Sequence, residues 1–233
     1  MLPAGVEAGG GSNLHDGLRD FLQTALGCTA EAAEGLHARS SERRYPPRAV
    51  ILRQGDRGSE TFLLVAGRAQ ALLYGLDGQL VLLQEFAPGD IFGALAEPDP
   101  EPQPADVVAV DEVRAAIILA MDFLTLIDMH ASLGLAVSRL LLKQLRAATG
   151  RMVERSTLSA VGRVHAELLR LARAADGHTI RPVPVFAALA VRVQSTRETV
   201  SRTISALERR GLVRREADAL VLTAPGRIED LVV

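Results

Sequence analysis

The spacing of apolar residues changes twice along the chain. Between positions 14 and 37, leucines and a phenylalanine recur at helical intervals, which predicts one or two short helices. Between positions 44 and 119, short runs of Val, Ile and Leu are separated by turn sequences. The turn glycines recur every 11 or 12 residues, at Gly55, Gly67, Gly78 and Gly89. This rhythm is typical of an antiparallel sandwich or barrel.

Two of the turn sequences carry specific expectations. Asp77-Gly78 predicts a tight hairpin, because a type I′ turn needs a positive φ at both central residues. Glu97–Pro104 (EPDPEPQP) has four prolines in eight residues and is therefore expected to be an irregular loop. Strand-like alternation resumes over Val107–Leu119.

After Met121 the apolar period becomes helical for about thirty residues. The apolar positions, at spacings of three and four, are Leu133, Val137, Leu140, Leu141, Leu145, Ala148 and Met152. A long helix with such a stripe predicts a dimer seam of the coiled-coil type. The alternative is a helix that folds back onto its own β domain.

Beyond residue 155 the pattern predicts helix, helix, helix and hairpin. An amphipathic helix over residues 158–171 is followed by a β-like stretch, Ile180–Val185, and by short helices near 186–193 and 196–210. Two strands between 212 and 222 would turn at 216–218. This order is that of a winged helix-turn-helix.

These patterns predict an α+β chain with four parts. Residues 1–13 are expected to be a flexible tail and residues 14–120 a β domain with N-terminal helices. Residues 121–155 would form the dimerisation helix and residues 156–233 the winged helix-turn-helix.

Charge is distributed unevenly between the two halves. Residues 1–155 carry 14 Lys and Arg against 20 Asp and Glu, a net charge of −6. Residues 156–233 carry 12 against 8, a net charge of +4. A basic C-terminal part is expected to meet a polyanion, although a modest asymmetry is also compatible with a surface bias without function.

The helix near 196–210 has the chemistry of a DNA-reading helix. Val200, Ile204 and Leu207 share one face and are expected to pack inward. The opposite face presents Arg197, Glu198, Ser201, Arg202 and Ser205. Arginine can pair bidentately with guanine, and glutamate can accept from the amino group of cytosine.

This helix resembles the recognition helix of the CRP/FNR family of bacterial transcription regulators, through Thr196–Arg202 (TRETVSR). Upstream, Gly55-Asp56, Gly67, Asp77-Gly78 and Pro88–Gly93 (PGDIFG) look like turns of the family's cyclic-nucleotide-binding-type β-roll, a jelly roll. The resemblance implies that Arg197, Glu198 and Arg202 read bases, and that Thr196 and Thr199 contact phosphates.

The same residues have plainer readings. Ser195-x-x-Glu198 is also a capping-box pattern, and Arg197, Arg202 and Arg209 would be ordinary at a solvated surface. Gln194 departs from the family pattern, which usually has glycine in the helix-turn-helix turn. A left-handed backbone there would cost about 1 kcal/mol.

The effector pocket that the resemblance implies lacks its polar groups. After Gly93, Ala94 stands where cyclic-nucleotide-binding members have a glutamate that binds the ribose. Gln103 and Pro104 stand at the Arg-Ser pair that grips the cyclic phosphate. Independently of alignment, no Arg or Lys occurs between Arg68 and Arg114. We therefore expect no response to cyclic AMP. The alternative is a β-roll that binds a different effector, such as another nucleotide, haem or a metabolite.

Other functions find little support. The single Cys28, the scattered histidines and the absence of HExxH, nucleotide-binding glycine loops or a Ser/His/Asp set argue against a metal site, a cofactor or an enzyme. No apolar run approaches the length of a membrane span, and no basic signal segment begins the chain, so we expect a cytoplasmic protein. Its expected partners are a pseudo-palindromic double-stranded DNA site, a second copy of the chain and RNA polymerase. An interaction module that has lost DNA binding is the remaining alternative.

Overall fold

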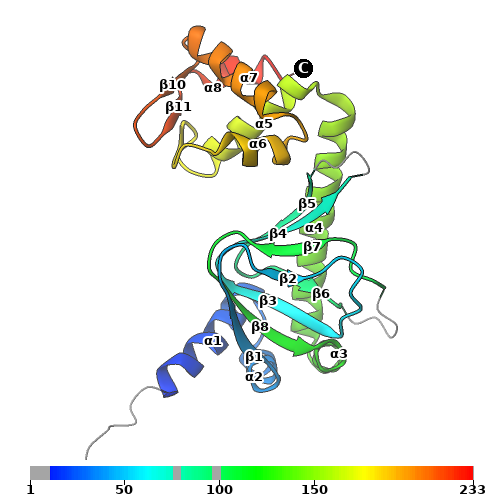
Figure 1. Ribbon diagram of the computed structural model, residues 1–233. Helices are drawn as coiled ribbons and strands as arrows, with labels where there is room; N and C mark the ends of the chain where they lie inside the picture. The colour runs from blue at the N-terminus through cyan, green and yellow to red at the C-terminus, as the bar shows by residue number, and fades with distance from the viewer. Residues whose placement is uncertain (1–10, 76–79, 96–100, 233) are drawn as a thin grey trace, which may run out of the picture. The chain divides into compact units, whose positions relative to one another are not determined.

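The computed structural model describes residues 11–75, 80–95 and 101–232 (Figure 1). The chain divides into two compact units. The first comprises Met1–Leu73 and Leu83–Leu145, and the second comprises Tyr74–Leu82 and Arg146–Val233. Each unit is described by itself below.

Two helices open the first unit, α1 (Gly11–Leu26) and α2 (Ala30–Arg39). They confirm the two short helices that the apolar spacing predicts. Residues 1–10 of the expected tail lie outside the described residues, but α1 begins at Gly11, so the predicted boundary at residue 13 is wrong. The hydroxyl of Thr29 caps α2 by accepting from the N–H of Ala32 at 3.3 Å.

Two four-stranded sheets follow, and they confirm the predicted β-roll. In the first sheet the order is β1 (Ser41–Tyr45), β8 (Val113–Leu119), β3 (Glu60–Ala66) and β6 (Ile91–Gly93), with antiparallel neighbours. In the second sheet the order is β2 (Val50–Leu52), β7 (Asp106–Ala109), β4 (Ala69–Tyr74) and β5 (Leu80–Phe86).

Strand β3 is buried on both faces, and this explains its unbroken apolar run. Because side chains alternate along a strand, Phe62 and Leu64 pack between the two sheets, while Leu63 and Val65 pack against the helices. The roll therefore has two apolar cores. The core between the sheets contains an aromatic stack, in which the ring centroid of Phe92 lies 5.2 Å from that of Phe62 and 4.8 Å from that of Phe86.

The turn signals are confirmed where the structure describes them. Gly67 has a φ of +81°, and a Cβ there would lie 2.2 Å from the backbone oxygen of Glu112, so only glycine fits. The Asp77-Gly78 turn lies outside the described residues. Of the proline-rich loop Glu97–Pro104, the described part, residues 101–104, contains no helix or strand.

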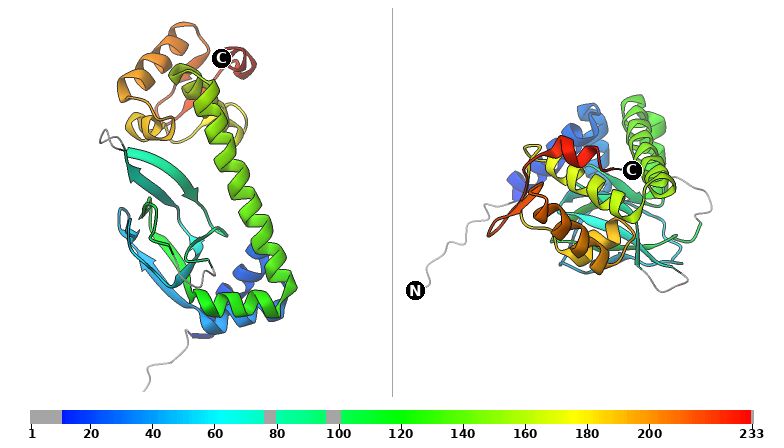
Figure 2. Two further views of the ribbon diagram at one scale, coloured as in Figure 1. Left: turned by 90° about the vertical axis from the view of Figure 1, so that its right-hand side faces the viewer. Right: turned by 90° about the horizontal axis from the view of Figure 1, so that it is seen from above.

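The predicted single helix over residues 121–155 is in fact two helices. They are α3 (Ala120–Met129) and α4 (Ala131–Thr157), bent by 117° at His130 (Figure 2). Among the described residues, no single helix is long and apolar enough to cross a membrane; only this bent pair, taken together, reaches that length and composition.

The apolar residues of α4 lie in two different environments, one buried and one exposed. Leu133 is fully buried, which contradicts its assignment to a dimer seam, and Val137 and Leu140 are partly buried against the same core of the first unit. They follow the alternative reading, a helix folded onto its own β domain. The other predicted seam residues are exposed: Leu141, Leu145, Ala148 and Met152. Leu135 and Leu142, which the sequence reading left out, are exposed beside them.

The second unit has the predicted order of a winged helix-turn-helix. Its helices are α5 (Ala160–Arg173), α6 (Phe186–Arg192), α7 (Arg197–Arg209) and α8 (Pro225–Glu229). Its three-stranded sheet has the order β10 (Val213–Arg215), β11 (Leu220–Leu222) and β9 (Thr179–Ile180). Only the first residue of the β-like stretch Ile180–Val185 lies in a strand. One apolar cluster joins α5, α6, α7 and the sheet.

Candidate nucleic-acid interface

The turn between α6 and α7 brings the recognition segment to the surface. Gln194 has a φ of +47°, which confirms the left-handed backbone expected where the family usually has glycine. The N–H of Ser195 then donates to the carbonyl of Ala190 at 2.9 Å and closes the turn. At this position a side chain strains the backbone by about 1 kcal/mol, so the turn needs compensating contacts.

Helix α7 begins one residue later than the capping-box pattern predicts. Thr196, not Ser195, is the N-cap, and its hydroxyl accepts from the N–H of Thr199 at 3.1 Å. Glu198 lies in the first turn. Its own backbone N–H and the hydroxyl of Thr196 hold the pKa of this carboxyl below its ordinary value, so Glu198 is ionised and acts as an acceptor.

The two faces of α7 have different chemistry. The inward face buries Val200, Ile204 and Leu207 as predicted. It also buries Thr203, whose hydroxyl is satisfied by donating to the carbonyl of Thr199 at 2.8 Å. The outward face exposes Arg197, Glu198, Arg202 and Arg209, with Ser201 and Ser205 half-buried between them. The structure thus brings the predicted DNA-reading residues together on one exposed face.

The arginines of this unit fall into two groups. Within the described residues, no side-chain hydrogen bond or ion pair engages Arg197, Arg202, Arg209 and Arg210, nor Arg146 on α4 and Arg227 on α8. Others are fixed: Arg192 donates to the buried carboxylate of Glu167 at 3.3 Å, and Arg170 bonds both Glu167 and Glu154. Four of these exposed arginines lie on and just after α7, where they are available to an external polyanion.

The wing holds its arginines against the protein. Arg214 pairs with Glu216 at 2.9 Å. Arg215 pairs with Glu208 at 3.2 Å, and its guanidinium carbon lies 5.3 Å from the centroid of the Phe186 ring. These contacts tie the hairpin to α7 and α6 and fix its position beside the recognition helix.

Arg163 is a residue of this site that the sequence analysis missed. From α5 its guanidinium donates to the carbonyls of Val193 at 2.8 Å and Gln194 at 3.0 Å, in the helix-turn-helix turn. It also donates to the carbonyl of Leu158 at 2.9 Å, just after α4. The acceptors are backbone atoms, which have no sequence pattern, so composition and spacing give no signal for this contact.

The region of the predicted effector pocket presents backbone and carbon rather than charge. Gly93 has a φ of +91°, and the N–H of Ala94 donates to the carbonyl of Glu60 at 2.9 Å. The backbone of Gln103 pairs with Gly55 and Asp56, and the ring of Pro104 is exposed. None of these groups can neutralise a phosphate.

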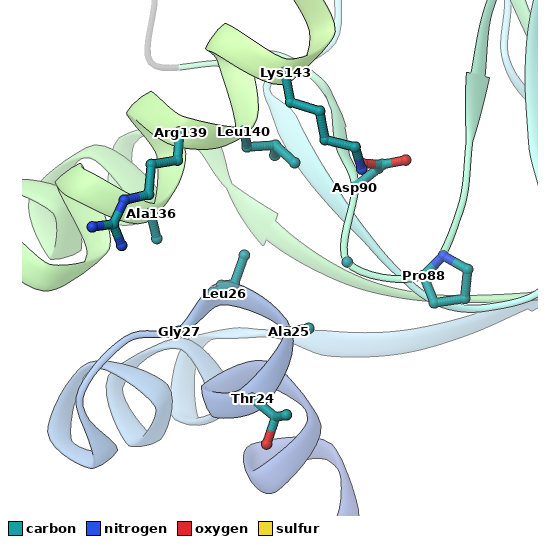
Figure 3. Close-up of a pocket in the computed structure, with 11 residues that line it drawn as sticks. Thr24, Ala25, Leu26, Gly27, Pro88, Asp90, Ala136, Arg139, Leu140 and Lys143 are labelled. Atoms are coloured by element: carbon teal, nitrogen blue, oxygen red, sulfur yellow. The ribbon is translucent and has the colours of Figure 1, made fainter.

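Two basic residues of α4, Arg139 and Lys143, lie away from the predicted effector pocket. Arg139 and Lys143 line a cavity of about 350 Å³ with the end of α1 and the turn Pro88–Asp90 (Figure 3). The ammonium of Lys143 lies 3.2 Å from the carboxylate of Asp90. Gly93, Ala94, Gln103 and Pro104 do not line this cavity. Lys143 is therefore committed to the β5–β6 turn.

Other effector chemistries have little support among the described residues. No group of three or more His, Cys, Asp or Glu side chains there is placed to hold a metal ion. Cys28 is buried, and burial raises the pKa of its thiol, which disfavours the reactive thiolate.

Comparisons with known proteins agree with this architecture. A family model of the cyclic nucleotide-binding domain matches residues 42–130, and a model of the Crp-like helix-turn-helix domain matches residues 162–231. The cyclic AMP receptor protein of Thermus thermophilus is 32% identical over 176 residues, which cover 74% of this chain and 79% of that protein. A CRP-like cAMP-activated global transcriptional regulator of Mycobacterium tuberculosis is 24% identical over 79% of this chain and 84% of its own length.

Solved structures share the fold. FixK2 from Bradyrhizobium japonicum matches with a TM-score of 0.70 at 20% identity, over 83% of this chain and 98% of its own. The c-di-GMP responsive regulator CLP of Xanthomonas campestris matches with a TM-score of 0.71 at 21% identity, over 84% and 100%. A nucleotide-binding-type roll followed by a helix-turn-helix defines a DNA-binding transcription regulator. The chain belongs to the CRP/FNR family of bacterial transcription regulators.

Proposed function

We propose that this regulator acts as a homodimer that reads a pseudo-palindromic DNA site through α7. The observation that carries the proposal is the exposed face of α7, where arginines that make no side-chain hydrogen bond or ion pair among the described residues flank an ionised Glu198. In each half-site, Arg197, Glu198 and Arg202 would read base edges in the major groove. At the start of the helix, the hydroxyls of Thr196 and Thr199 would contact DNA phosphates, and Ser201 would contact the DNA beside them.

The proposed dimer forms along α4. Exposed apolar residues follow a heptad, with Leu135, Leu142, Leu145 and Met152 on one line and Leu141 and Ala148 beside it. Two-fold symmetry along this seam would place two recognition helices in successive major grooves, roughly 34 Å apart. In this proposal residues 14–120 are the sensor domain, 121–155 connect and dimerise, and 156–233 bind DNA. RNA polymerase is the proposed partner at the promoter, in the cytoplasm.

We further propose that cyclic AMP is not the effector, although relatives of this chain are named for it. A buried cyclic phosphate needs a cation, and neither the stretch from residue 69 to 113 nor Lys143, which is bound to Asp90, supplies one. The alternative is a roll that binds a different effector and switches DNA affinity.

One experiment tests the proposal. Duplexes that bind the full chain are selected from a random-sequence pool, and their affinity is measured with and without 1 mM cyclic AMP at fixed salt. We expect a two-fold-symmetric consensus and the same affinity in both arms. Recovery of no consensus would refute sequence-specific reading, and tighter binding with the nucleotide would refute effector independence.

A further inference from the structure

Arg163 makes a contact that the proposed function does not yet use. It lies in the first turn of α5, half-buried, and its guanidinium donates to three backbone carbonyls. Two of these, on Val193 and Gln194, belong to the turn that leads into α7. The third, on Leu158, follows directly after the end of α4. Within the described part of the chain, Arg163 has no acidic partner.

The three acceptors are carbonyls that have no partner within a helix. Val193 is the C-cap of α6, Gln194 follows it with a left-handed backbone, and Leu158 lies between α4 and α5. Carbonyls at helix ends need external donors. A planar guanidinium can bond several of them at fixed angles, which a single ammonium group cannot do. The hydrogen bonds from the Arg163 guanidinium thus compensate for the backbone strain at Gln194, which a glycine at this position would avoid.

The turn sets the direction in which α7 leaves it. Thr196, the N-cap, comes two residues after Gln194, and Arg197 and Glu198 come next. An error in the backbone at position 194 would therefore be carried directly into the residues that face DNA. Apolar packing of Val200, Ile204 and Leu207 holds the helix on the core but leaves its first turn dependent on the preceding backbone.

We propose that Arg163 is a positioning residue for DNA recognition, which binds the strained turn at Gln194 to the chain segment after α4 and so fixes the start of the recognition helix. This inference rests on the proposed function, since its consequence is read as DNA specificity. It assigns the role to a residue that contacts neither bases nor phosphates.

The test compares Arg163→Met, Arg163→Lys, Gln194→Gly and the double variant Arg163→Met/Gln194→Gly. The matched control is Arg173→Met, on the same helix, where the same charge is removed away from the turn. For each full-length protein, affinity is measured for the selected palindrome and for a random duplex, at one salt concentration. Circular dichroism and urea unfolding establish the folded fraction, and affinities are corrected for it.

We expect Arg163→Met to weaken binding to the palindrome by about tenfold or more, and binding to random DNA no more than Arg173→Met does. Arg163→Lys should behave like Arg163→Met, because one ammonium cannot bond three carbonyls. Gln194→Gly should change the wild-type affinity by less than about twofold, yet recover at least about threefold in the Arg163→Met background, because glycine adopts the left-handed backbone without strain.

Three results would overturn the inference: an equal loss on both duplexes, an equal loss in Arg173→Met, or no recovery from Gln194→Gly. Amide hydrogen exchange of residues 194–199, measured without DNA, separates this inference from the proposed function. Faster exchange in Arg163→Lys than in the wild type supports the clamp even if no duplex is bound. Unchanged exchange contradicts it.

Discussion

The roll and the DNA-binding unit differ most in where they hold positive charge. Between Arg68 and Arg114 the roll has no basic residue, and its interior is an aromatic and aliphatic core. The DNA-binding unit holds arginines both fixed to carbonyls and carboxylates and uncommitted on α7. The roll therefore has the architecture of a cyclic nucleotide-binding domain, and we propose that it does not bind a cyclic phosphate.

The difference has a physical cause. The roll is stabilised by alternating apolar positions such as Phe62, Leu64 and Ile117, and none of these contributes charge to a ligand. Ala94, Gln103 and Pro104 can therefore replace polar groups without loss of the fold. In α7, by contrast, the residues proposed to read DNA alternate with the residues that pack the helix. Fold similarity thus carries more functional weight in the second unit than in the first.

The largest effect is expected from breaking the proposed seam of α4. Leu145 is 63% exposed in the single chain, so Leu145→Asp should leave each unit folded but oppose dimerisation by placing a charge in an apolar seam. We expect a monomer at micromolar concentration and an affinity for the palindrome lowered about 100-fold or more, because linked binding to two half-sites is lost. Sedimentation and DNA titration measure both.

Ala147→Asp is the matched control, since Ala147 is exposed on α4 at the heptad position opposite the seam. It should remain dimeric. A dimeric Leu145→Asp, or a monomeric Ala147→Asp, would show that the seam lies elsewhere.

The next largest effect is expected on base reading. Arg202→Ala should lose about 1–3 kcal/mol of discrimination at one guanine in each half-site. Thr199→Ala should instead weaken all duplexes about equally, because a phosphate contact carries no sequence information. Competition with single-base variants of the palindrome measures the ratio. Unchanged specificity in Arg202→Ala would remove this residue from the reading face.

A smaller effect is expected from the cap of α7. Thr196→Ala should lower the free energy of unfolding by about 1 kcal/mol, because the N–H of Thr199 loses its acceptor. Thr196→Ser should restore it. Ser195→Ala, one residue earlier, should cost less, since Ser195 is not the cap. Urea denaturation of the three variants tests this, and a larger loss for Ser195→Ala would contradict the observed helix start.

The sequence allowed much of this site to be predicted, and the misses have specific causes. The spacing of apolar residues correctly predicted α7 and its buried face, because Val200, Ile204 and Leu207 can share one side only if the segment is helical. The same period failed in α4, since Leu133 and Leu145 look alike in a sequence, and only the packing of the roll distinguishes them. The Arg163 contact was beyond prediction because its partners are carbonyls. The cap at Thr196 was misplaced by one residue because Ser195 and Thr196 are both good caps.

A weaker effect concerns a buried imidazole in the DNA-binding unit. Burial holds the pKa of His165 below its ordinary value of about 6.5, even though its Nδ1 lies 3.2 Å from the carbonyl of Leu231. The folded state therefore binds fewer protons than the unfolded state, so stability is full above about pH 6.5 and falls as the pH drops toward the folded pKa. Urea unfolding at pH 7.5, 6.5 and 5.5 should show this decline, and His165→Gln should reduce it. An unchanged decline in that variant would assign it to other groups.

For cyclic nucleotides we expect no effect at all, and this prediction tests the difference between the roll and the DNA-binding unit most directly. To bind, cyclic AMP or cyclic GMP would have to bury its phosphate in the roll. The ammonium of Lys143 on α4 already pairs with Asp90. The ribose would meet Ala94, which offers no side-chain acceptor. An unpaired buried charge is strongly unfavourable, so we expect no heat of binding for either nucleotide at 100 µM and no change in DNA affinity. The cyclic AMP receptor protein of Thermus thermophilus, studied in the same cell and buffer, is the positive control. A micromolar dissociation constant for this chain would contradict the expectation and would mean that a basic residue outside positions 69–113 binds the phosphate. Loss of that binding in Lys143→Met would identify the residue as Lys143, which would then have to leave Asp90.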